Sequence, residues 1–185
     1  MPKNLYDTLL DVSKSSMIDA GDMQSAGLLI LTAAIHGLGI NRAGIWLLTE
    51  DKQAICGKML IDGDECKLDS DLCLARRDFP RYFDSLDTER AVVANNAYTD
   101  PGTYEFRDNY LIPNGITSML DAPIRHRGNM LGIICCEHQG DARVFRQLLQ
   151  QQPAERGLAG ADLAGELHET AAAALADAEQ QVRER

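Results

Sequence analysis

The chain has 185 residues, of which 45% are apolar and 25% charged, a composition typical of one globular domain with room for a helical extension. The formal net charge of −10 and the lack of a dense Lys/Arg run argue against nucleic-acid binding. No apolar run approaches the roughly 18–20 residues of a membrane span, and the N-terminus carries no secretory pattern. The five cysteines are odd in number and follow no disulfide or zinc spacing, so we expect reduced thiols in a cytoplasmic protein.

Two helices are predicted at the N-terminal end. They cover 4–14 and 22–36, because apolar residues recur at helical spacing in both segments. The candidate caps of the second helix are Asp19 or Asp22 before it and Gly37 or Gly39 near its end. Its apolar face is expected to comprise Leu28, Leu31, Thr32 and Ile35.

Strands and short helices alternate through the middle of the chain. The predicted strands are 43–50 and 54–60 as a hairpin, then a short strand around 71–75 within the polar stretch 61–75, then 90–95, then 116–124 and 130–138 as a hairpin about the turn 125–129. The predicted helices are 78–89, with Asp78 as a cap and Pro80 in the first turn, and 99–112, stopped by Pro113.

The tail, 142–185, contains almost no strand formers and reads as two helices. The second helix carries a narrow, Ala-rich stripe that suits close helix packing or a coiled-coil seam. The stripe comprises Leu163, Leu167, Ala171, Ala174, Leu175, Ala178 and Val182.

This order of elements predicts a mainly antiparallel sheet of five or six strands with helices on both faces. The helix over 22–36 and the C-terminal helix are expected to cover one face, and the segments 61–89 and 96–115 the other. The second layer is rich in loops, and a loop-rich layer over a sheet is where a pocket usually forms.

Two segments of the sequence resemble those of a GAF domain, and the resemblance covers roughly residues 20–140. They are "INRAGIWLLTED" at 40–51 and, within 82–140, the stretch "ITSMLDAPIRHRGNMLGIICCEH". The resemblance implies an α/β (α+β), GAF/PAS-like fold, with an N-terminal helix over 1–18, a GAF core over 19–140 and a helical segment over 141–185. After the core the sequence departs from the family pattern, because Phe145 stands where Trp is common and a Gln-rich stretch follows.

The resemblance further implies a regulatory sensor of bacterial signalling rather than an enzyme. Such a domain commonly stands ahead of a histidine kinase, a diguanylate cyclase (GGDEF) unit or a phosphodiesterase unit. We therefore expect an unidentified small-molecule ligand, a homodimer formed through the terminal helices, and possible attachment to an effector in the same chain. The alternatives are a ligand-free dimerisation module and a GAF-fold thiol enzyme of the free methionine sulfoxide reductase type.

Known ligand signatures of the family do not match this sequence. The cyclic-nucleotide branch carries an Asn-Lys pair, a downstream Phe and then Asp-Glu, whereas here Asn95 is followed by Asn96 and Ala97, and Phe106 leads to "RDNY". Covalent bilin binding often uses a Cys-His dipeptide, which this sequence lacks. The ligand and any cofactor stay unknown at this point.

Asp121 stands in the predicted strand 116–124, on the face that alternation also gives to Met119. Either Asp121 faces a ligand, or it pairs with Arg107 or a backbone amide of the scaffold. The scaffold interpretation is preferred because the scaffold usually satisfies buried polar groups. The pocket candidates are Trp46, Cys73, Tyr82, Phe83, Tyr104, Arg107, Met119, Asp121 and Cys135.

Three further side chains suggest chemistry. Arg107 suits a ligand anion, although a scaffold ion pair is the preferred interpretation. In "CCEH" the residues Cys135 and Glu137 share one strand face, opposite Cys136, so too few ligands converge for structural zinc and no metal site is expected. A thiol enzyme would need Cys73 or Cys135 as a nucleophile, and the sequence shows no neighbour that favours a thiolate.

Overall fold

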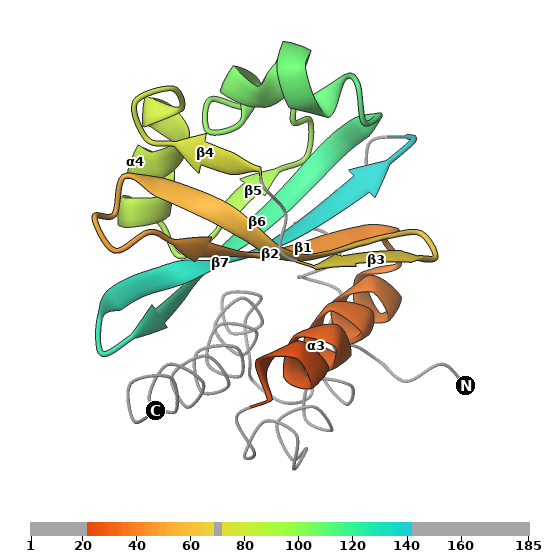
Figure 1. Cartoon of the computed structure of the whole chain (residues 1–185). Coiled ribbons are helices and arrows are strands. Elements are labelled where there is room, and N and C mark those ends of the chain that lie inside the picture. Colours follow the sequence, from red (N-terminus) through yellow and green to blue (C-terminus); the bar gives the residue numbers. More distant parts are fainter. Residues whose placement is uncertain (1–21, 69–71, 142–185) are drawn as a thin grey trace, which may run out of the picture.

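The computed structural model describes residues 22–68 and 72–141. They form a seven-stranded antiparallel sheet in the order β3-β2-β1-β7-β6-β5, with β4 also pairing with β2. Helices lie on both faces of this sheet (Figure 1). No helix among these residues is long and apolar enough to cross a membrane. The helices predicted over 4–14 and 142–185 lie outside the described residues.

The helix α3 (Met23–Leu38) has the caps that its sequence predicts. The side chain of Asp22 accepts hydrogen bonds from the backbone N–H groups of Gln24 and Ser25, which would otherwise have no partner in the first turn. Gly39 ends the helix in the left-handed conformation, with φ of 62°. The predicted apolar face is wrong at Leu28, which is 45% exposed. The buried residues of α3 are Ala26, Gly27, Ile30, Leu31, Ala33, Ala34 and Leu38.

Two antiparallel hairpins make the centre of the sheet, as predicted. The first joins β1 (Arg42–Leu48) to β2 (Ala54–Asp62), and the second joins β6 (Ile116–His126) to β7 (Asn129–Gln139). The β6–β7 turn uses positive φ values at Arg127 and Gly128. Because β1 pairs with β7, the two hairpins lie side by side.

The remaining elements are short. They are β3 (Glu65–Leu68), β4 (Cys73–Ala75), α4 (Pro80–Thr88), β5 (Val92–Ala94), the 3₁₀ turn η1 (Tyr104–Phe106) and the π-helical turn η2 (Arg107–Leu111). The segment expected to cover the sheet over 61–89 partly belongs to it, since β3 extends the sheet beyond β2. Asp78 is not the cap of α4, which begins after Phe79 with Pro80 in its first turn.

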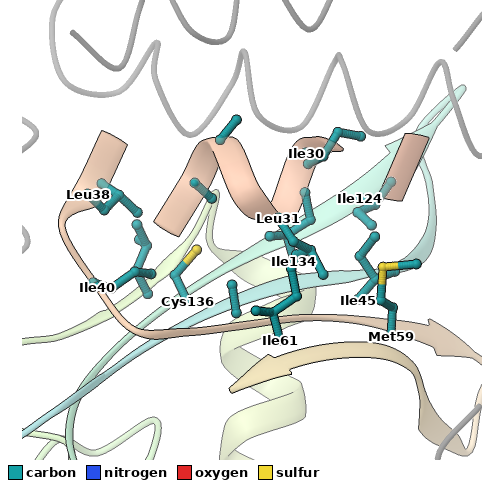
Figure 2. Packing of buried hydrophobic residues seen from close by; sticks show 14 of the residues in the cluster. Ile30, Leu31, Leu38, Ile40, Ile45, Met59, Ile61, Ile124, Ile134 and Cys136 are labelled. Carbon is teal, nitrogen blue, oxygen red and sulfur yellow. The ribbon is translucent and has the colours of Figure 1, made fainter. Parts of the chain in front are cut away.

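Two apolar cores lie on opposite faces of the sheet. The first packs α3 against the sheet (Figure 2) and includes Leu31, Ile45, Ile134 and Cys136. The second packs α4 and the 96–115 segment against the other face (Figure 1) and is built mainly from aromatic side chains and Ile, Leu and Met. This second core contains the candidate site.

The strands β1 and β7 approach each other very closely at Gly132. A Cβ atom at this position would lie 2.1 Å from the backbone oxygen of Trp46, a distance that real Cβ atoms do not reach. Glycine is therefore required here, because any side chain would push the two central strands apart. The approach also fixes Trp46 beside Ile133 in the wall of the second core.

Candidate functional site

The second core contains a small, partly open cavity between the sheet and the layer formed by α4, η1 and η2. Its volume is about 10 Å³, which is room for about one water molecule. Its walls are Trp46, Leu74, Tyr82, Phe106, Tyr110, Met119, Asp121, Ile133, Cys135 and Glu137.

Strand alternation brings two carboxylates to this cavity. In the β6–β7 register, Asp121 is opposite Cys135 and Met119 is opposite Glu137. Residues two apart on a strand point to the same face, so Asp121 and Glu137 come diagonally together with the Cys135 thiol beside both. Both carboxylates are buried, with exposed fractions of 0% and 1%.

Asp121 is held by a tyrosine from the covering layer. The hydroxyl of Tyr82, on α4, donates a hydrogen bond to Asp121 Oδ2 over 2.5 Å. Burial raises the pKa of Asp121 to about 7, while hydrogen bonding from Cys135 and Tyr82 opposes the rise. The predicted pairing with Arg107 is wrong, since Arg107 is more than half exposed and lies beside Asp108 at 3.7 Å.

Glu137 is held by a buried arginine at the start of β1. Arg42 Nε donates to Glu137 Oε2 over 2.5 Å, and the same guanidinium forms an ion pair with Asp62. Arg42 also donates to the Tyr110 hydroxyl over 3.2 Å. Burial raises the pKa of Glu137, and the Arg42 guanidinium opposes this rise. One arginine thus joins β1, β2, β7 and η2.

Each carboxylate has one oxygen with no hydrogen-bond partner. No described residue is in position to donate a hydrogen bond to Asp121 Oδ1 or Glu137 Oε1, although the Cys135 thiol lies beside both carboxyls and Tyr110 lies beside Glu137. A buried acceptor without a partner costs roughly 1–3 kcal/mol. The acidic residues of the cavity therefore have unsatisfied hydrogen-bond acceptors, while the other lining residues are mainly aromatic or aliphatic.

Cys135 faces the cavity as a neutral thiol. Its side chain is buried between the two carboxylates, and burial together with their negative charge raises its pKa well above the ordinary value. A nucleophilic cysteine needs surroundings that favour the thiolate, and this position has the opposite character.

The structure brings five of the nine predicted pocket residues together. The residues at the cavity are Trp46, Tyr82, Met119, Asp121 and Cys135. Their role in binding a ligand stays a prediction. Four others lie elsewhere: Phe83 is buried in the core beside Tyr82, Tyr104 is 39% exposed beneath Arg81, and Arg107 and Cys73 are exposed.

The expectation of reduced thiols is wrong for two cysteines. Cys56 on β2 and Cys73 on β4 face each other in the strand register and form a disulfide, with their Cα atoms 4.1 Å apart. Cys66, Cys135 and Cys136 are free. The sequence spacing does not reveal this pair, because the pairing of β4 with β2 brings it together.

Sequence reasoning missed half of the cavity wall. The missed residues are Leu74, Phe106, Tyr110, Ile133 and Glu137. Strand alternation puts Glu137 on the same face as Cys135, so Glu137 could have been predicted as a cavity residue from the sequence. Arg42 carried a weaker signal, as a charged residue directly before an apolar strand.

The mainly antiparallel sheet with helices on both faces is the fold of a known domain family. A sequence model of the GAF domain family matches residues 22–165. The chain belongs to the GAF domain family. A comparison with curated proteins found no match.

Solved structures share the whole fold at low sequence identity. The GAF domain of an Acinetobacter phosphoenolpyruvate-protein phosphotransferase is 13% identical with a TM-score of 0.67, covering 99% of each chain. The phycoerythrobilin-bound GAF domain of a cyanobacterial phytochrome is 14% identical with a TM-score of 0.71, covering 98% of this chain and 100% of that one. The free methionine-R-sulfoxide reductase of Neisseria meningitidis, solved with its substrate, is 12% identical with a TM-score of 0.62, covering 96% and 89%.

Proposed function

We propose that this chain is a regulatory sensory domain that binds a small molecule in the cavity beneath α4, η1 and η2. The observation that carries the proposal is the pair of buried carboxylates that line the cavity, each of which has one oxygen without a hydrogen-bond partner among the described residues. Because buried polar atoms are nearly always satisfied, unsatisfied acceptors that meet at one cavity indicate a place for a ligand.

The signal passes from the cavity to an effector through a change in conformational population. A ligand that binds one state more tightly than another shifts the balance between them by its difference in affinity. We further propose that the helices predicted from the sequence at the two ends of the chain pair across a cytoplasmic homodimer and transmit a small rotation or shift to a histidine kinase, diguanylate cyclase or phosphodiesterase unit. The relatives from a phosphotransferase and a phytochrome support a regulatory role.

A ligand-free dimerisation module is the second candidate, and the size of the cavity favours it. A volume of about 10 Å³ accommodates a water molecule but not a metabolite without movement of the wall. The thiol enzyme has no such support, because Cys73 is in a disulfide and burial keeps Cys135 protonated.

Native mass spectrometry of the whole chain, purified without refolding from its own host, tests the proposal. We expect an additional mass that leaves on denaturation and is absent from Cys135→Leu, in which a larger side chain occupies the cavity. The matched control Cys66→Leu changes an exposed free cysteine and is expected to retain that mass. An unliganded dimer whose melting does not respond to a metabolite panel would instead support the dimerisation module.

A further inference from the structure

We propose that the cavity selects a small organic cation with N–H donors, an ammonium or amidinium group, which the free oxygens of Asp121 and Glu137 would accept. This inference rests on the proposed function and specifies the class of ligand. It starts from two unsatisfied acceptors, Asp121 Oδ1 and Glu137 Oε1, which belong to two residues that line the same cavity. A ligand that satisfies both must donate hydrogen bonds in two directions, as a primary ammonium or an amidinium does.

The charge of the site favours a cation over a neutral donor. The residues that line the cavity include two acids and no Lys, Arg or His. Arg42, behind this wall, is already paired with both Glu137 and Asp62. With the carboxylates ionised, one guanidinium therefore balances the charge of only one of three acids. An anionic ligand would meet like charge at close range in surroundings of low dielectric.

The aromatic walls favour the same class of ligand. Trp46, Tyr82, Phe106 and Tyr110 all line the cavity. A cation within about 6 Å of an aromatic ring is attracted to the negative face of the ring, and the attraction is larger when the cation is removed from water. Two hydrogen-bond acceptors in an aromatic enclosure are suited to a cationic group with an apolar remainder.

The composition of the cavity also distinguishes an organic cation from a metal ion. Within the described ranges 22–68 and 72–141, no group of three or more His, Cys, Asp or Glu side chains is placed to hold a metal. The dimensions set the size of the first group to enter. A volume of about 10 Å³ holds one water-sized group, such as the nitrogen end of a probe, and the rest of the probe enters only if the cavity wall moves, so the test begins with very small probes.

The decisive experiment compares probes of similar shape and different charge on the whole chain. Acetamidinium, acetamide and acetate differ little in size, and methylammonium is a smaller cation. Each is titrated while the amide signals of β6 and β7 are followed by NMR, with sodium chloride added to equal ionic strength. We expect saturable shifts around Asp121 and Glu137 with the two cations, at an affinity at least tenfold higher than for acetamide, and no binding of acetate.

Variants identify the site. Asp121→Asn keeps the shape of the side chain and is expected to weaken cation binding at least tenfold, and Glu137→Gln likewise. Asp87→Asn, which removes an acid that pairs with Arg76 away from the cavity, is expected to leave the affinity unchanged. If Asp121→Asn and Glu137→Gln do not fold, the comparison of acetamidinium with acetamide on the unaltered chain still shows whether the cavity prefers a cation.

The outcomes separate this inference from the proposed function. Equal binding of acetamidinium and acetamide, or tighter binding of acetate, would overturn the cation class. A neutral or anionic molecule retained in native mass spectrometry would leave the sensory function intact and equally overturn the cation class. Absence of any retained mass, together with absence of binding by every probe, would overturn both.

Discussion

The hydroxyl of Tyr82 donates to a carboxyl oxygen of Asp121 across the boundary between α4 and the sheet, over 2.5 Å. Both side chains are buried. This hydrogen bond connects the covering layer to the β6–β7 hairpin, and Asp121, whose second oxygen has no partner among the described residues, also lines the cavity. The residue is therefore part of the scaffold and of the cavity wall at once, although the sequence presented these roles as alternatives.

Tyr82→Phe is expected to destabilise the domain by roughly 1–3 kcal/mol, because Oδ2 of the buried Asp121 carboxyl would lose its hydroxyl donor. Denaturant unfolding of the variant and the unaltered chain measures this difference. Tyr98→Phe is the matched control, since the Tyr98 hydroxyl makes no hydrogen bond to another described residue. Equal losses in the two variants would show that the Tyr82 hydroxyl contributes nothing specific.

Asp121 is expected to make the domain less stable as pH rises from about 4 to about 7. In the folded state burial raises the pKa of Asp121 to about 7 from an ordinary value of 3.8, so the folded state binds the extra proton between these limits. The contribution is complete below pH 4 and is lost by about pH 7, on the order of 4 kcal/mol at most. The titratable and charged groups around it are Tyr82, Tyr110, Cys135, Glu137 and Arg42.

The comparison with Asp121→Asn isolates this effect from the other acids of the chain. We expect the free energy of unfolding of the variant, relative to the unaltered chain, to increase between pH 5 and pH 8. Urea unfolding at each pH provides the measurement. A constant difference over this range would mean that Asp121 is ionised throughout.

Arg42→Met is expected to destabilise the domain by about 3–5 kcal/mol, because Glu137 would stay buried without its partner. Adding Glu137→Gln removes the unpaired charge, so the double variant should lose less than the sum of the single losses. Lys67→Met breaks an exposed ion pair with Glu65 and should change stability much less. Additive losses for Arg42 and Glu137 would contradict the coupling.

Gly132→Ala is expected to cost about 1–3 kcal/mol or more, because its methyl group meets the backbone oxygen of Trp46. Thermal unfolding detects the loss, and a change in Trp46 fluorescence is expected with it. Gly63→Ala provides a useful contrast: its Cβ would meet nothing within 4 Å, although its φ of 59° adds backbone strain. A smaller loss at Gly132 than at Gly63 would refute the steric argument.

The disulfide between Cys56 and Cys73 predicts a specific pattern of thiol reactivity. Alkylation of the unfolded chain without reductant should leave these two cysteines unlabelled and modify the other three. Reduction should lower stability by about 3 kcal/mol, because the bond closes a loop of 17 residues. Cys66→Ser should lower the number of modified cysteines from three to two, leave Cys56 and Cys73 unlabelled, and leave the effect of reduction on stability unchanged. Five reactive thiols without reductant would exclude the bond.

Local patterns predicted most of the fold. Asp22 and Gly39 marked the ends of α3, and two runs of apolar residues about short turns gave the two hairpins. The edge strand β3 carried no such pattern, because all four of its residues are exposed. Its pairing with β2 has no counterpart in the alternation of apolar and polar residues on which the prediction depended.

Only half of the residues that line the cavity were predicted, because most of the others come from segments far apart in the sequence. Alternation on one strand indicates that Met119 and Asp121 share a face. It cannot reveal that Tyr82, on α4, donates to Asp121, or that Arg42 reaches Glu137 from the start of β1. Such pairs depend on how the helices and strands pack, and a single sequence contains no periodicity that records this.

The neighbouring strands β6 and β7 contribute side chains to both apolar cores. Asp121 and Cys135 line the cavity, while their chain neighbours Leu120 and Cys136 pack in the core beneath α3. The sheet is thus a single partition whose opposite surfaces cannot be displaced independently. A ligand in the cavity that displaces the backbone of β6 or β7 would therefore change how α3 packs on the opposite face of the sheet, without any contact between α3 and the ligand.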